Sequence, residues 1–157
     1  MRRIALDTNL LVLYVVGSVA PHLLKFPRRH KRLAEYDPEA FLLLLEQLEG
    51  ADLVTTPNAM TEASNLVVQG LRGSLRAEVL AALARFSELA REHYEPSRGV
   101  TEAPEYLRLG LADTAWLAVL DRETELLTVD LGLYLAALDR GLPARNFNHL
   151  RDPDARQ

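Results

Sequence analysis

Short apolar segments alternate along this chain with longer segments in which apolar residues recur every three or four positions. The first short segment, Ile4 to Leu6, is flanked by charge, stops on Asp7 and leads directly into a second apolar run. This pattern is typical of a buried strand that continues into a helix. Similar short segments bounded by turn residues predict three more strands, at 51–55, 125–128 and 144–147.

The segments between these strands have helical patterns. An N-cap signature at Asp37, followed by proline and glutamate, predicts a helix that ends at Gly50. Gly17 and Ser18 are expected to end the first helix, which leaves residues 17–36 as a connection with at most a short helix. Further helices are predicted at 57–70, 73–92, 104–109, 111–120 and 131–140, with a loop at 93–104.

Strands separated by helices imply right-handed crossovers and a parallel sheet with helices on both faces. We therefore predict an α/β fold with three α-β-α layers and a central parallel sheet of about four strands. The length of 157 residues fits one domain. We expect this domain to cover residues 1–150 and a polar tail to follow at 151–157.

Composition narrows the class of protein. The hydrophobic fraction of 48% and the charged fraction of 25% are those of an ordinary soluble protein. Cysteine is absent, which excludes disulfide frameworks and thiolate metal sites. Asp7 and Asn9 interrupt any signal-peptide core, and the apolar stretch from Leu10 to Val16 is too short to cross a bilayer. We expect a cytoplasmic protein that does not contact membranes.

The net charge of −4 argues against a nucleic-acid binder that relies on overall positive charge. Positive charge is instead concentrated in one short segment, by Lys25, Arg28, Arg29, Lys31 and Arg32. Such a cluster is usually a solvated surface. It becomes a candidate for RNA phosphate contacts if the chain acts on RNA.

Four carboxylates are predicted to meet at one edge of the sheet. Asp7 and Asp130 end strands, Glu62 lies early in the helix that leaves the second strand, and Asp113 lies in the first turn of a nearly all-apolar helix. All strands of a parallel sheet end at the same edge, and ligands bind at that edge in open α/β sheets. The four acids are therefore candidates for one shared site.

Each acid also has a structural alternative. Asp7 and Asp130 could cap the following helices, Glu62 could form a surface ion pair, and Asp113 could be stabilised by the helix dipole. Asp113 is the hardest to explain in this way, because a carboxylate in so apolar a helix is costly to bury without compensation. We favour the shared site over four separate structural roles.

Clustered carboxylates repel one another unless a cation lies among them. An all-oxygen set without cysteine or histidine suits Mg²⁺ or Mn²⁺. One or two such ions would polarise a phosphodiester and lower the pKa of a bound water. The acids thus predict metal-assisted hydrolysis of a phosphate ester.

These residues resemble the PIN-domain family. The match spans nearly the whole chain in the family's order, and it consists of Leu6-Asp7-Thr8-Asn9, Thr56-Pro57 with Glu62, Leu111-Ala112-Asp113-Thr114-Ala115, and Leu127-Thr128-Val129-Asp130 with Tyr134 nearby. The resemblance implies a metal-dependent endoribonuclease, commonly the toxin of a VapC-type toxin–antitoxin pair.

The resemblance also implies roles for individual residues. Asp7, Glu62, Asp113 and Asp130 match the catalytic residues that bind Mg²⁺ or Mn²⁺. Asn9 and Thr128 match positions that support the acids by hydrogen bonding. RNA is the implied substrate and an antitoxin protein a possible partner, and we expect a homodimer.

Other readings of the sequence fit less well. A phosphate-receiver domain needs a lysine late in the chain, and none follows Lys31. A haloacid-dehalogenase-type phosphatase would want a second aspartate where Asn9 stands. The segment from Asn146 to His149 follows the last strand, and we expect it to be structural rather than supporting the acids. A non-catalytic RNA-binding or protein-binding module on the same fold is the main alternative.

Overall fold

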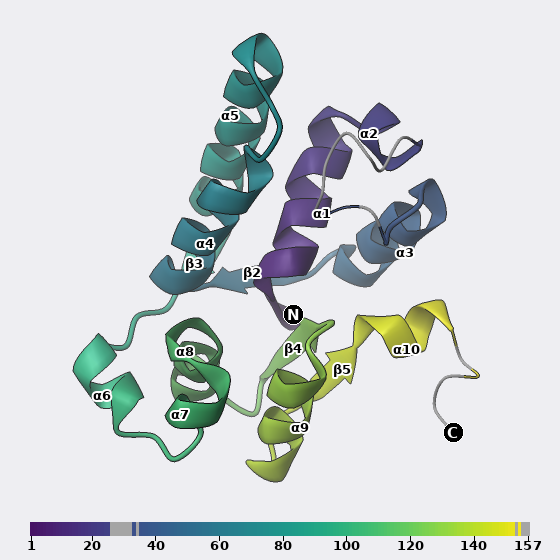
Figure 1. Ribbon diagram of the computed structural model, residues 1–157. Helices are drawn as coiled ribbons and strands as arrows, with labels where there is room; N and C mark the ends of the chain where they lie inside the picture. The colour runs from purple at the N-terminus through teal and green to yellow at the C-terminus, as the bar shows by residue number, and fades with distance from the viewer. Residues whose placement is uncertain (26–32, 34, 153, 155–157) are drawn as a thin grey trace.

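The computed structural model describes residues 1–25, 33, 35–152 and 154. In this part of the chain, five parallel strands form one sheet in the order β3-β2-β1-β4-β5 (Figure 1). The strands are β1 (Arg3–Leu6), β2 (Asp52–Thr55), β3 (Arg91–Glu92), β4 (Thr124–Thr128) and β5 (Ala144–Asn146). The predicted α/β class and parallel sheet are confirmed, and the sheet has one strand more than expected.

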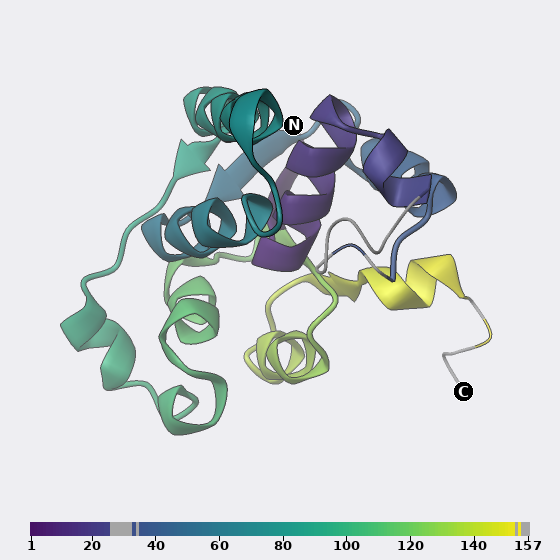
Figure 2. The ribbon, with the colours of Figure 1, turned by 45° about the horizontal axis from the view of Figure 1, so that its top comes forward.

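Helices cover both faces of this sheet, as Figures 1 and 2 show. On one side lie α1 (Thr8–Val19), α2 (His22–Lys25), α3 (Pro38–Leu48), α4 (Pro57–Val67) and α5 (Gly73–Leu89). On the other side lie α6 (Ser97–Thr101), α7 (Tyr106–Leu109), α8 (Leu111–Val119) and α9 (Leu131–Asp139), and α10 (Phe147–Arg151) follows β5. The predicted three-layer arrangement is therefore confirmed. In the described residues, no helix has both the length and the hydrophobicity needed to cross a bilayer.

Alternation along the strands divides the core into two parts. Ile4 and Leu6 of β1 are fully buried among side chains of the α1, α3, α4 and α5 layer. Ala5, between them, faces the opposite layer together with Trp116 and Leu133. Successive side chains of a strand point to opposite faces. An entirely apolar β1 is thus explained by burial on both sides.

The extra strand β3 is where the helix prediction was wrong. Helix α5 ends at Leu89 rather than near Glu92, and after Ala90 the residues Arg91 and Glu92 pair with the last two residues of β2. Arg91 and Glu92 are both exposed, so no apolar alternation marks them as a strand. Pairing with the free edge of β2, supported by a 3.0 Å ion pair between Arg91 and Asp52, makes this segment extended.

The first helix also differs from its prediction, because α1 continues through Gly17 and Ser18 to Val19. Gly17 is buried against α3, and a Cβ at this position would lie 2.5 Å from Cδ2 of Phe41. The glycine therefore permits close packing of α1 and α3 instead of ending the helix. One glycine in a helix costs about 1 kcal/mol. The packing of the apolar helix α1 against its neighbouring helices outweighs this cost.

Two further short helices lie where no helix was predicted. Helix α6 lies within the predicted 93–104 loop, and α10 begins at Phe147, which was assigned to the last strand. Arg151, at the end of α10, lies 5.1 Å from the centre of the Tyr36 ring and donates a 2.7 Å hydrogen bond to the carbonyl of Glu35. Tertiary contacts thus continue past residue 150, the predicted end of the domain.

Candidate active site at the carboxyl edge of the sheet

Asp7 lies at the end of β1, where β1 borders β4. Its backbone N–H donates a 3.1 Å hydrogen bond to the carbonyl of Leu127, and the residue is only 4% exposed. One carboxylate oxygen, Oδ1, accepts a 2.7 Å hydrogen bond from the N–H of Thr8, so Asp7 is also the N-cap of α1. The structural role and the site role that the sequence left open are therefore compatible.

Thr128 connects Asp7 to Asp130. Its hydroxyl donates a 2.5 Å hydrogen bond to Oδ2 of Asp7 and accepts a 3.0 Å hydrogen bond from the backbone N–H of Asp130. Asp130 is itself held in place, because its Oδ1 accepts a 2.8 Å hydrogen bond from the N–H of Leu133 as the N-cap of α9. The expected hydrogen bond from Thr128 to an acid is thus present.

This pair of strand ends is also the point where the fold changes direction. The chain leaves β1 through α1 on one side of the sheet, and it leaves the neighbouring strand β4 through α9 on the other side (Figure 1). In open α/β sheets, ligands generally bind outside the carboxyl ends of the strands at such a reversal. Asp7 directly follows β1, and Asp130 lies two residues after β4, the two strands at this point.

Asp113 and Glu62 reach this edge from α8 and α4. Asp113 is half-buried in the first turn of α8, as expected. Glu62 is exposed on α4, and no ion pair involves it within the described residues, so the ion-pair alternative finds no partner there. The four acids come from four separate elements of the chain.

The charges of these acids act on one another. Burial raises the pKa of Asp7 to about 6, against the hydrogen bonds from Thr128 and Thr8, and the charges of Asp130 and Glu62 add to the rise. The pKa of Asp113 is raised to about 7, chiefly by burial, and the charges of Asp7, Asp130 and Glu62 also raise it. Like charges disfavour ionisation of a neighbouring carboxylate. The structure therefore brings the four predicted acids into one electrostatic cluster.

The cluster has the chemistry of a hard-cation site, since all its donors are carboxylate oxygens and a cation would relieve the repulsion. Among the described residues, however, no three carboxylate or imidazole side chains stand close enough together to hold an ion as they are. Asp7 is fixed by two hydrogen bonds, whereas Glu62 is exposed and makes no ion pair in that part of the chain. A metal ion would therefore require rotation of the more exposed acids toward Asp7.

The remaining residues that the sequence singled out differ in how far the structure supports their expected roles. Asn9 is exposed in the first turn of α1, and none of the hydrogen bonds found among the described residues joins it to the four acids. Asn146 is buried, and its Oδ1 caps α10 by accepting a 2.9 Å hydrogen bond from the N–H of Asn148, which agrees with the structural role expected for it. Of the basic cluster, Lys25 ends α2, while Arg28, Arg29, Lys31 and Arg32 lie outside the described residues.

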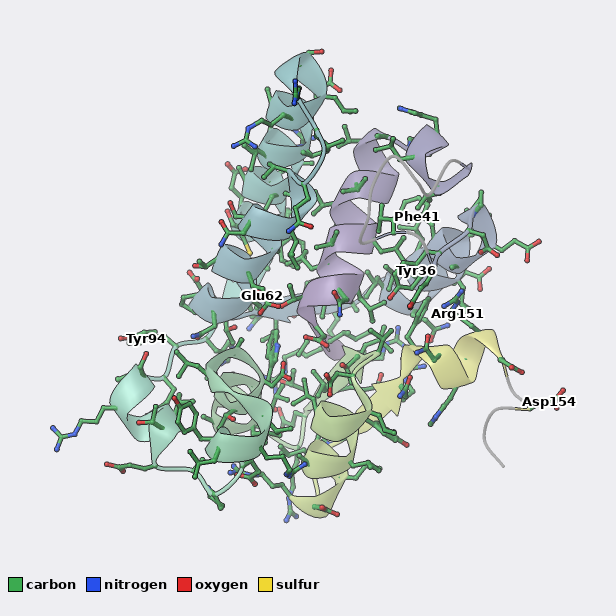
Figure 3. All side chains as sticks on the ribbon, in the orientation of Figure 1. Tyr36, Phe41, Glu62, Tyr94, Arg151 and Asp154 are labelled. Carbon is green, nitrogen blue, oxygen red and sulfur yellow. The ribbon has the colours of Figure 1, made fainter. Side chains whose placement is uncertain are left out.

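Sequence reasoning did not single out Tyr36, whose ionisation responds to the charge of Asp7. Its side chain is buried, and burial raises the pKa of its phenol to about 12, with the charge of Asp7 contributing to the rise. Figure 3 labels Tyr36 together with Arg151, which packs over its ring. Tyr36 lies in the 17–36 connection, where proline and glycine residues interrupt any periodic pattern, so no sequence signal singled it out.

Two buried hydroxyls near the same edge were also missed. Thr55 ends β2, and Thr114 follows Asp113 in α8. In the described part of the chain, neither hydroxyl has a hydrogen-bond partner. A buried hydroxyl is normally paired, with protein or with water, so these two are candidates for contacts with ordered water near the acids.

An open groove includes Glu62 in its lining. It has a volume of about 450 Å³ and is lined by α4, by residues 94–97 and by the start of α8. Glu62 and Tyr94, which are both labelled in Figure 3, belong to its lining. The groove therefore adjoins the acid cluster through one of the cluster's own members.

Comparison with known proteins identifies no family and no function for the chain. No protein-family model and no curated protein matches the chain. The fold is similar to that of a domain of a functionally unknown protein from Methanocaldococcus jannaschii DSM 2661, with 17% sequence identity and a TM-score of 0.49. The similarity covers 93% of this chain and 91% of that one. The resemblance to the PIN-domain family stays a prediction from the sequence.

Proposed function

We propose that this chain is a divalent-metal-dependent endoribonuclease of the PIN-domain type, which hydrolyses phosphodiester bonds in RNA. The observation that carries the proposal is the hydrogen-bonded chain from Asp7 through Thr128 to Asp130 at the adjoining ends of β1 and β4. A single buried aspartate would have many explanations, but here hydrogen bonds hold two acids at fixed positions at the carboxyl ends of adjacent strands. Such fixed positions are what a catalytic constellation requires.

The chain's own residues would act by holding charge in place. Thr128 and the N–H of Thr8 prevent the Asp7 carboxylate from turning, and the first turn of α9 does the same for Asp130. Asp113 and Glu62 would complete the set of oxygen donors for Mg²⁺ or Mn²⁺. The bound metal would supply a polarised phosphate and a water with a lowered pKa.

RNA is the substrate in this proposal, and the protein acts in the cytoplasm as a homodimer. An antitoxin protein is its candidate partner, because the resemblance to VapC-type proteins carries that expectation. A small upstream reading frame with a DNA-binding N-terminus and an amphipathic C-terminal helix would support the toxin role. Light scattering of the purified protein measures the oligomeric state directly.

The deciding experiment is cleavage of a mixed RNA pool by the purified chain in EDTA, Mg²⁺ or Mn²⁺. Asp7→Asn, Glu62→Gln, Asp113→Asn and Asp130→Asn should each abolish the metal-dependent cleavage. Their effects should be non-additive, because the acids act as one unit. Asp139→Asn is the matched control, since Asp139 is exposed at the opposite end of α9 and should tolerate the change.

The outcomes separate the two classes of function. Cleavage that survives in the Asp113→Asn protein would refute the assignment of the site. Metal-independent RNA binding without any cleavage by the wild type would instead support the non-catalytic binding module.

A further inference from the structure

The groove beside Glu62, here called the α4–α6 groove, has the dimensions of a small-molecule site. Its volume of about 450 Å³ lies within the range of roughly 300–1,000 Å³ that such sites have. One wall is a face of α4 that carries Asn58, Thr61, Glu62 and Asn65 at helical spacing. The opposite wall includes Tyr94, which lies just before α6.

The groove is continuous with the acid cluster at two points. Glu62 lines the groove and also raises the pKa of Asp7 and Asp113 through its charge. Ala112 lines the groove and directly precedes Asp113 in α8. A ligand whose reacting phosphate lies at the acids would therefore extend its neighbouring part into this groove.

The lining of the groove is unsuited to a phosphate. It contains Glu62 and Glu95, and no lysine or arginine is among its described lining residues. Both glutamates would repel a phosphodiester. The part of the ligand that occupies the groove must therefore be uncharged.

The same lining suits a nucleobase. The side chain of Tyr94 is 70% exposed, so its ring is accessible to a flat partner. Asn58 and Asn65 offer amide donors and acceptors, and Thr61 offers a hydroxyl. Unpaired RNA bases are bound by stacking on aromatic side chains and by hydrogen bonds to their edges.

We propose that the α4–α6 groove binds one unpaired nucleobase next to the bond that is cut, with Tyr94 as its stacking surface. This inference rests on the proposed ribonuclease function and deepens it. Tyr94 is a positioning residue here, since it would hold the base and not the reacting phosphate. Asn58 and Asn65 would read the edge of that base.

The test combines a protein variant with a change in the RNA. The ligand is a short single-stranded RNA that the wild type cleaves at one bond, alongside copies in which each base in turn is replaced by an abasic site. Affinity is measured by fluorescence anisotropy in EDTA, and kcat/KM is measured in Mg²⁺. Tyr94→Ala should weaken binding of the intact RNA roughly 10-fold, while Tyr94→Phe retains the affinity.

The abasic RNAs separate stacking from a structural effect. In the wild type, one abasic position beside the cleaved bond should weaken binding by a similar factor, and this penalty should vanish in Tyr94→Ala. Leu107→Ala is the control, since Leu107 is 94% exposed on α7 outside the groove and its loss should change neither quantity. If every abasic site weakens binding equally in Tyr94→Ala and in the wild type, the inference is overturned while the ribonuclease function stands. A wild type that neither binds nor cleaves RNA would overturn both.

Discussion

The hydroxyl of Thr128 donates a 2.5 Å hydrogen bond to Oδ2 of Asp7, although the two residues are 121 positions apart in the sequence. Both side chains are buried, so the bond is shielded from water. A carboxylate buried in this way depends on its donors, because an unsatisfied buried charge is costly. The bond therefore joins the ends of β1 and β4 and sets the orientation of the most buried acid.

Replacement of Thr128 tests that relationship. Thr128→Val keeps the side-chain shape but leaves Oδ2 of Asp7 and the N–H of Asp130 without their partner, which should lower the free energy of unfolding by about 1–3 kcal/mol. RNA cleavage should fall at least ~10-fold, as expected when a fixed catalytic group is freed. Urea unfolding in EDTA and an RNA cleavage assay measure the two effects.

Two variants control this prediction. Thr128→Ser retains the hydroxyl and should restore most of the activity. Thr124→Val alters a buried threonine at the opposite end of the same strand, so it should leave cleavage unchanged. If Thr128→Val and Thr124→Val cleave RNA equally well, the hydrogen bond has no role in the site.

The raised pKa values of Asp7 and Asp113 predict how stability depends on pH without metal. Both native pKa values lie above the usual value of 3.8, so between about pH 4 and pH 7 the native state holds protons that the unfolded chain releases. Stability must then fall as the pH rises through this window. Thermal unfolding in EDTA at low salt should show a melting temperature that decreases from pH 5 to pH 8.

Asp113→Asn should flatten that pH dependence, because the amide removes one titrating group at nearly constant volume. At pH 7.5 the variant without metal should melt roughly 2–4 °C above the wild type, which corresponds to about 1 kcal/mol for a domain of this size. Asp139→Asn should leave the pH profile unchanged. A variant that melts below the wild type would mean that Asp113 is an ordinary helix-terminus acid.

Addition of metal should reverse the order of wild type and variant. If the wild type binds Mg²⁺ with a dissociation constant of about 1 mM, roughly 10 mM Mg²⁺ stabilises it by about 1.4 kcal/mol. The melting temperature should then rise by roughly 3–6 °C, as differential scanning fluorimetry can measure. Asp113→Asn should gain much less. Equal gains in both proteins would place the Mg²⁺ effect outside the four acids.

The close packing of α1 on α3 gives a prediction that is independent of function. Gly17→Ala places a methyl group against the Phe41 ring, and overpacking of this kind should destabilise the protein by about 1–3 kcal/mol. The double variant Gly17→Ala with Phe41→Ala should lose less than the sum of the two single changes, because the ring that clashes is gone. Chemical denaturation measures all three proteins.

The neighbouring residue supplies the control for this pair. Ser18 is exposed and donates a 2.6 Å hydrogen bond to the carbonyl of Tyr14 in its own helix, so Ser18→Ala should change stability by less than about 0.5 kcal/mol. Strict additivity of the Gly17 and Phe41 changes would show that the two residues do not press on each other.

The sequence by itself determined the order of the main strands and helices and the edge at which the acids gather. Apolar strands such as Ile4 to Leu6 are buried on both faces, so their composition identifies them without any tertiary information. Because parallel strands all end at one edge, Asp7 and Asp130 could be assigned to the same edge from order alone. The strands and helices that carry these acids could be recognised from local sequence patterns.

Only the tertiary structure decided which of these residues touch. It also decided the conformation of segments whose sequence carries no local signal. Arg91 and Glu92 are extended because β2 has a free edge, and Gly17 stays helical because Phe41 packs against it. Tyr36 is buried although it lies in a connection that has no periodic pattern, and its position there follows from packing of the whole fold. The hydrogen bond between Asp7 and Thr128 requires β1 and β4 to be neighbours, and strand order is set by packing of the whole chain rather than by either segment.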